Sequence, residues 1–197
     1  IGYKDIAQMF LRGYVKVREQ KEKINKINMF PVPDQDTGSN LEKTLSGIYK
    51  YLSSSNYASL EELARGAVES ALIEASGNVG IITTSFLSGF LNTLQDPVTN
   101  KGLRDGFAFA AKKAHASVQD PKEGTILDVI ESAAKTSKQV VSEKEEDIII
   151  LLKRIVVETR KAVEKTEEKM EVYKKAAVVD AGAYGLFVFL EGFLEAL

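Results

Sequence analysis

The amino-acid sequence predicts an all-α protein, an antiparallel up-and-down bundle of eight helices. Apolar residues recur at spacings of three and four along most of the chain, which is typical of amphipathic helices. The four prolines lie between these periodic segments, where they interrupt no helix. Two short β-branched runs, residues 140–141 and 148–150, are embedded in the helical period and therefore do not indicate strands. The connections are short, as antiparallel neighbours require.

The first four expected helices cover residues 3–26, 39–53, 59–74 and 80–94. The first three each place their apolar residues on one face: Ile6, Met9, Phe10, Tyr14 and Val15, then Leu41, Leu45, Ile48 and Tyr49, then Leu60, Leu63, Ala67, Ala71 and Leu72. The fourth is apolar nearly all round, which predicts a central position in the bundle.

The last four expected helices cover residues 102–118, 125–141, 144–169 and 183–196. The Lys- and Glu-rich stretch 161–175 is interpreted as the solvated face of the seventh helix running into a loop. In the last helix, Phe187, Phe189 and Phe193 are expected to pack in the core.

Composition excludes several classes of function. The chain has 197 residues, enough for one domain, and 44% of them are hydrophobic. Its 26 Lys and Arg against 28 Asp and Glu give no basic excess for nucleic acid or an anionic membrane. Without cysteine and with a single histidine, His115, it lacks the residues for thiolate zinc sites and Ser-His-Asp chemistry. Any metal must be held by oxygen, which favours Mg²⁺ or Ca²⁺.

No apolar stretch is long enough to span a membrane, and no signal peptide is visible. We therefore expect a cytoplasmic protein. The chain starts at Ile1 and stops within an expected helix, so we keep open that it is a piece of a longer protein.

Four motifs rich in small and polar residues interrupt the helical pattern: the first motif (residues 28–40), the second (76–80), the third (120–125) and the fourth (180–183). Each precedes an even-numbered helix of the predicted bundle. In an antiparallel bundle alternate helices start at the same end, so we expect all four motifs at one rim.

The first motif suggests a metal–nucleotide site. In extended chain Asp34 and Asp36 point to the same side, and such a pair suits Mg²⁺, which takes one or two carboxylates together with phosphate oxygens. The start of the following helix offers free amides to a phosphate. A purely structural interpretation is equally open, because Ser39 and Glu42 have the spacing of a capping box. Taken singly, the glycines of the other motifs are better explained by helix capping or close packing.

The first motif, NMFPVPDQDTGSN, resembles the signature of the N-terminal ATP-binding domain of bacterial fatty acid kinases, within the dihydroxyacetone-kinase L-type (Dak phosphatase) family. The resemblance continues in order through the second motif, residues 123–127 and residues 179–186, and spans essentially the whole chain. It implies a single domain over residues 1–197 with an eight-helix barrel fold. It also implies ATP or ADP with two Mg²⁺ ions at one rim.

The resemblance assigns roles residue by residue. Asp34 and Asp36 match metal ligands, and Asn28 stands beside the place of a further aspartate. The positions that match nucleotide-binding segments are Thr37, Gly38, Ser39, Asn40, Gly77, Asn78, Gly80, Gly124, Thr125, Asp180, Ala181 and Gly182. No catalytic residue is assigned.

The resemblance implies a kinase whose phosphoryl acceptor is presented by another protein or domain. The FPVPD form of the first motif favours a fatty acid carboxylate, which is already ionised and needs no strong general base. A dihydroxyacetone acceptor is the alternative. A homodimer is a further candidate assembly.

The chain departs from the family pattern at three places, and two of these departures, Gln35 and Val79, favour a different function, a non-catalytic nucleotide sensor. Gln35 replaces the usual Gly between the two aspartates, Val79 replaces a Ser, and Ala183-Tyr184 replaces a Gly-Gln pair. We expect Gln35 to crowd the metal site or restrict the backbone, and Tyr184 to place a bulky ring near the fourth motif. A helical interaction bundle with incidental loops is a third hypothesis.

Overall fold

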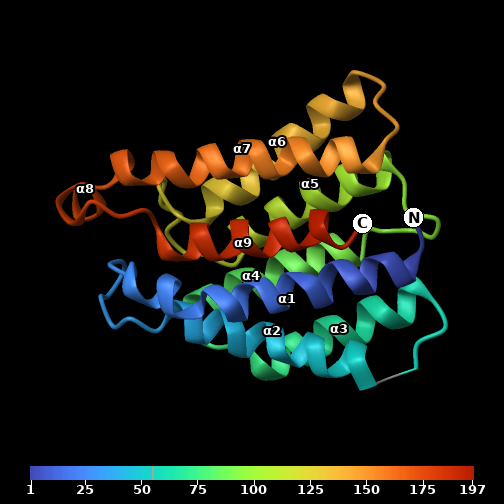
Figure 1. Cartoon of the computed structure of the whole chain (residues 1–197), viewed down its shortest axis with the longest axis horizontal. Helices are drawn as coiled ribbons and strands as arrows, with labels where there is room; N and C mark the ends of the chain where they lie inside the picture. Colours follow the sequence, from blue (N-terminus) through green and yellow to red (C-terminus); the bar gives the residue numbers. More distant parts are fainter. Residues whose placement is uncertain (55) are drawn as a thin grey trace.

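The computed structural model describes residues 1–54 and 56–197. Within these residues all regular structure is helical (Figure 1). The helices are α1 (Tyr3–Lys26), α2 (Thr37–Ser54), α3 (Leu60–Glu74), α4 (Gly77–Leu91), α5 (Asn100–Ala116), α6 (Ile126–Ser142), α7 (Ile148–Lys169), α8 (Glu171–Ala176) and α9 (Ala181–Glu195). The predicted all-α class is confirmed.

The long helices form a closed ring around one apolar core. Most helices contact the next one along the chain, and α9 closes the ring by packing against both α7 and α1. Phe187, Phe189 and Phe193 of α9 are buried in this core, as the sequence predicts. Both chain ends lie at one end of the ring, and α8 lies at the other (Figure 1).

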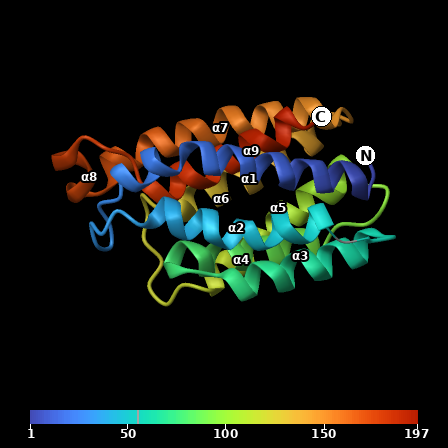
Figure 2. The ribbon, with the colours of Figure 1, turned by 60° about the horizontal axis from the view of Figure 1, so that its bottom comes forward.

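The most enclosed helix is α9, not α4. Helix α9 contacts α1, α2, α6 and α7, whereas α4 keeps Ile81 more than half exposed. The all-apolar pattern of α4 therefore does not mean that every face of it is covered. In Figure 2, α3 and α4 lie along the lower edge of the bundle.

The short helix α8 corrects the prediction of eight helices. Helix α7 ends at Lys169, and Met170 is extended, with φ −129° and ψ 134°. The chain then forms α8 and turns again at Ala177, which adopts the left-handed conformation with φ 51°. The stretch expected to be a simple solvated helix face is therefore broken, because Tyr173 turns inward and is fully buried.

Several helix starts differ from the predicted ones. Helix α2 begins at Thr37 and α4 at Gly77, so parts of the first and second motifs are the opening turns of these helices. Helix α7 begins after Asp147, whose side chain accepts a hydrogen bond from the Ile149 amide, and not at Lys144, which adopts a positive φ.

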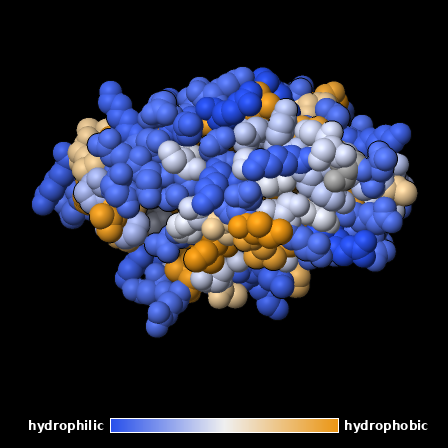
Figure 3. Space-filling model, turned by 90° about the horizontal axis from the view of Figure 1, so that it is seen from below, coloured by the Kyte–Doolittle hydropathy of each residue, from blue (hydrophilic) through white to orange (hydrophobic). Residues whose placement is uncertain are grey.

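The surface is largely polar. Among the described residues no helix combines the length and apolar character needed to cross a bilayer. Figure 3 shows apolar side chains gathered on the face seen from below. The large exposed apolar residues of α3 and α4 are Leu72, Ile73 and Ile81. The prediction that Leu72 belongs to the buried face of α3 is therefore wrong, because its side chain points to this surface and is 59% exposed.

Candidate functional site

One cavity of about 650 Å³ collects residues from all four motifs. The motif residues that line it are Asn28, Phe30, Pro31, Val32, Asp34, Asp36, Thr37, Asn40, Gly77, Asn78, Val79, Asp120, Lys122, Thr125, Asp180 and Gly182. The expectation that the four motifs meet at one rim is thereby confirmed. The size falls in the range of small-molecule sites, about 300 to 1,000 Å³.

The Asn28 side chain holds the first motif together through three hydrogen bonds. Its side chain is 2% exposed and donates to the Val32 carbonyl oxygen at 2.7 Å and to Asp34 Oδ1 at 3.1 Å. Its Oδ1 accepts a hydrogen bond from the Thr37 hydroxyl. The aspartates Asp34 and Asp36 are exposed on the cavity side. A buried amide thus fixes the loop that presents two carboxylates.

The opening turn of α2 is held by Asn25 of α1, a residue that sequence reasoning missed. Asn25 Oδ1 accepts from the Ser39 amide at 3.0 Å, and its Nδ2 donates to Ser39 Oγ at 2.9 Å. Because α2 begins at Thr37, Ser39 lies inside the helix. The Glu42 side chain accepts a hydrogen bond from the Tyr14 hydroxyl. The capping-box interpretation of Ser39 and Glu42 is wrong, because the helix starts two residues earlier.

The second motif is tied to the first through Asn40. Ser76 Oγ donates to Asn40 Oδ1 at 2.9 Å. Gly77 has φ +63°, and a Cβ there would lie 2.7 Å from Asn40 Nδ2. The backbone at the start of α4 therefore packs directly against the Asn40 side chain of α2.

The third motif is fixed by an acidic residue in the first turn of α6, Asp128. The Gly124 amide donates to both carboxylate oxygens of Asp128, at 3.2 and 3.1 Å. Asp128 Oδ2 also lies 2.6 Å from Lys169 Nζ, and this ion pair raises the pKa of Lys169. Lys122 and Thr125, on either side of Gly124, line the cavity.

Asp180 joins the fourth motif to α9. Its Oδ2 accepts from the Ala183 amide at 2.7 Å, which caps the helix, and its Oδ1 accepts from the Tyr173 hydroxyl at 2.5 Å. The carboxyl group is 5% exposed, and burial raises its pKa to about 6 against the opposing effect of these hydrogen bonds.

The predicted site residues divide into two groups. Ten of them line the cavity, namely Asn28, Asp34, Asp36, Thr37, Asn40, Gly77, Asn78, Thr125, Asp180 and Gly182. The remaining five do not line it, namely Gly38, Ser39, Gly80, Gly124 and Ala181. Gly38, for example, packs against α1, where a Cβ would lie 2.3 Å from the Lys21 carbonyl oxygen. Ala181, at the start of α9, is buried.

Lys122 and Phe30 line the cavity without having been singled out from the sequence. Within the described part of the chain, Lys122 is the one cationic side chain among the lining residues, and its Nζ lies 2.7 Å from Asp120 Oδ2. The position of Lys122 inside the third motif is the sequence feature that could have predicted its place in the cavity.

The departures from the family pattern leave the cavity open. Gln35 is exposed and is not a lining residue, but its φ of +57° lies in the region that favours glycine. The Tyr184 ring lies outside this cavity, where its hydroxyl accepts from Lys23 Nζ at 2.9 Å. Only Val79 lines the wall, as an apolar residue.

The carboxylates of Asp34 and Asp36 suit a cation whose other ligands come from phosphate oxygens and water. In the described chain no three His, Cys, Asp or Glu side chains come together as a metal site. Two carboxylates alone, Asp34 and Asp36, match the way Mg²⁺ binds in proteins, through one or two carboxylates plus phosphate oxygens and water.

Comparison with known proteins identifies the family. The DAK2 domain profile matches residues 31–195. This chain belongs to the DAK2 domain family. Its DAK2 domain is 32% identical to an uncharacterized protein of Mycoplasma pneumoniae, the MG369 homolog, over 99% of the chain and 36% of that protein. It is 31% identical to an uncharacterized protein of Staphylococcus aureus over 100% of the chain and 36% of that protein. The chain thus spans about a third of the length of these relatives.

Two solved structures share the fold of the DAK2 domain. The native dihydroxyacetone kinase of C. freundii superposes with a TM-score of 0.73 and 16% identity, over 98% of this chain and 34% of that one. The same enzyme in complex with AMP-PNP and Mg²⁺ gives a TM-score of 0.72 over 97% of this chain and 33% of that one. At this identity the likeness concerns the fold.

Proposed function

We propose that the cavity binds ATP or ADP together with Mg²⁺, and that the domain is the nucleotide-binding part of a phosphotransferase. The observation that supports this best is the convergence of four helix starts and two exposed aspartates on one cavity. Helix starts offer amides and the positive end of the helix dipole to phosphate. The fold relative solved with AMP-PNP and Mg²⁺ adds support.

The charges of the cavity argue for a cation between protein and phosphate. Four aspartates line it (Asp34, Asp36, Asp120 and Asp180) against Lys122. A polyphosphate would be repelled by this wall unless cations bridge the two. Asp34 and Asp36 would hold Mg²⁺, for which we propose two ions, and bound Mg²⁺ would neutralise charge on the β- and γ-phosphates. Asn28 would orient Asp34 or add an amide oxygen.

The proposed acceptor is a fatty acid carboxylate presented by another protein or domain. A carboxylate oxygen would attack the γ-phosphorus, forming an acyl phosphate while the bond to the β-phosphate oxygen breaks and ADP leaves. The acceptor is already ionised, so the step requires no base from the cavity. The DAK2 domain would contribute positioning and charge stabilisation.

Removing the aspartates tests the nucleotide site. We expect Asp34→Ala and Asp36→Ala each to weaken Mg²⁺-dependent ATP binding at least about 100-fold, because each removes a ligand of the bridging cation. The measurement is isothermal titration with and without Mg²⁺, with circular dichroism to show that the helices persist. Asp105→Ala, at an exposed position of α5, is the matched control.

Two outcomes would contradict this proposal. One is a wild-type domain that binds no nucleotide at millimolar concentration. The other is a double variant, D34A and D36A together, that binds as tightly as the wild type. Binding without phosphoryl transfer, assayed by trapping acyl phosphate with hydroxylamine in the presence of a fatty-acid-loaded carrier protein, would favour the sensor function.

A further inference from the structure

Tyr173 is a fully buried aromatic residue at the rim of the barrel. It belongs to α8, the six-residue helix at the motif end (Figure 1). The side chain is 0% exposed, yet among the described residues it is not part of the continuous apolar core formed by the long helices. The contacts that bury Tyr173 come from segments around the cavity, including Phe30 and Asp180. These local contacts therefore have to explain why the side chain turns inward.

The side chain touches two cavity motifs at once. Its hydroxyl donates to Asp180 Oδ1 at 2.5 Å, while Asp180 Oδ2 caps α9. Its ring packs edge-on against Phe30 of the first motif, with ring centroids 6.4 Å apart and planes at 80°. Phe30 and Asp180 both line the cavity, and Tyr173 does not.

The two contacts join segments that are far apart in the sequence. The first motif follows α1, and the fourth precedes α9. Asp180 is further anchored to α7, since its amide donates to the Thr166 hydroxyl at 2.9 Å. A displacement of Tyr173 would therefore remove a contact that the first and the fourth motif share.

We infer that Tyr173 is a positioning residue that fixes the first and fourth motifs relative to each other from behind the cavity. That the ligand positioned in this way is Mg²⁺-ATP rests on the function proposed above. The competing role is simple space-filling, in which the ring matters and the hydroxyl does not.

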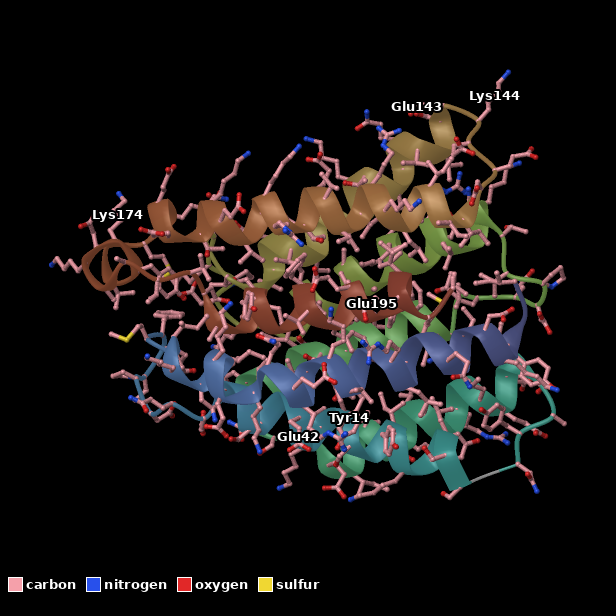
Figure 4. All side chains as sticks on the ribbon, viewed as in Figure 1. Tyr14, Glu42, Glu143, Lys144, Lys174 and Glu195 are labelled. Atoms are coloured by element: carbon pink, nitrogen blue, oxygen red, sulfur yellow. The ribbon has the colours of Figure 1, made fainter. Side chains whose placement is uncertain are left out.

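The chain offers a matched pair of substitutions. Tyr173→Phe keeps the ring and removes the hydrogen bond to Asp180. Tyr14→Phe removes the same kind of bond, from the Tyr14 hydroxyl to Glu42 Oε1 at 3.0 Å. Tyr14 and Glu42 lie on α1 and α2, away from α8 (Figure 4), and neither lines the cavity.

Amide hydrogen exchange without nucleotide tests the coupling itself. In Tyr173→Phe we expect peptides from residues 27–36 and 177–183 to exchange at least about 3-fold faster, because both motifs lose a shared anchor. In Tyr14→Phe these peptides should exchange at the wild-type rate. Unchanged exchange in the first motif of Tyr173→Phe would overturn the inference. Should that variant fail to fold, Phe30→Leu tests the coupling from the other side, with faster exchange expected in residues 177–183.

Nucleotide titration then tests the consequence for binding. At a temperature where every variant is fully folded, we expect Tyr173→Phe to bind Mg²⁺-ATP about 10-fold more weakly and Tyr14→Phe to bind like the wild type. A space-filling role predicts equal affinity for all three proteins, and that result would refute positioning. If the wild type binds no ATP, the proposed function fails, whereas the exchange experiment still decides the role of Tyr173.

Discussion

Asp180 is a buried carboxyl group whose ionisation should make the stability of the protein depend on pH. Its pKa is raised to about 6 in the folded state from an ordinary value of 3.8. Between these two values the folded protein holds a proton that the unfolded chain has released. The contribution of Asp180 to the free energy of unfolding therefore falls as pH rises, by about 3 kcal/mol in total.

Asp180→Asn removes this titration and keeps an acceptor for the Ala183 amide. We expect the stability of the variant relative to the wild type to rise by about 3 kcal/mol between about pH 4 and pH 7. Urea unfolding at several pH values measures the difference. Nearby titratable groups, Tyr173 on α8 and Asp128 on α6, are present in both proteins. A flat difference, or one with the opposite slope, would contradict the raised pKa.

At the scale of single elements, the start of α4 depends on the absence of a side chain at Gly77. The positive φ of Gly77 and its approach to Asn40 both disfavour any other residue. We expect Gly77→Ala to lower the free energy of unfolding by about 1–2 kcal/mol and to weaken nucleotide binding, because Asn40 must move.

Gly102→Ala in the first turn of α5 is the control for this substitution. There the nearest atom to an added Cβ is Thr99 Oγ1 at 3.6 Å, an ordinary contact. Stability within about 0.5 kcal/mol of the wild type, or above it, is expected for the control. Equal effects of the two alanines in urea unfolding would show that the close approach at Gly77 has no cost.

At the scale of the whole molecule, the barrel closes where α1 meets α9. A Cβ at Gly192 would lie 2.4 Å from the Gly13 Cα, so the two backbones are in direct contact. This contact lets α9 enter the ring and bring Asp180 to the same end as the first motif.

A larger side chain at the contact between α1 and α9 should lower the stability of the entire fold. We expect Gly192→Val to lower the free energy of unfolding by about 3 kcal/mol and the Tm by about 6–12 °C, because backbone atoms cannot rotate away from the added methyl groups. Thermal unfolding followed by circular dichroism measures this, with Gly102→Ala as the reference. A Tm within a degree of the wild type would mean that α1 and α9 separate without penalty.

Much of the site could be predicted because its signals are local. The adjacency of Asp34, Asp36 and the start of α2 is written in consecutive residues, and the order of the helices places all four motifs at one end. The supporting contacts could not be predicted in this way. Asn25 to Ser39 and Lys169 to Asp128 join different helices, 14 and 41 residues apart, and their partners depend on how those helices pack.

By itself, the sequence determined the helical class, most of the residues that the long helices bury, with Leu72 as an exception, and the motifs that interrupt the pattern. These features follow from a 3.6-residue period and from turn chemistry, both of which act over a few neighbouring residues. Only the tertiary structure decided that α8 exists, that Tyr173 turns inward and that Gly38 and Ser39 contact α1 and do not line the cavity. A polar, lysine-rich segment has no local reason to fold inward; the hydrogen bond to Asp180 and the Phe30 ring supply that reason only when the barrel has closed.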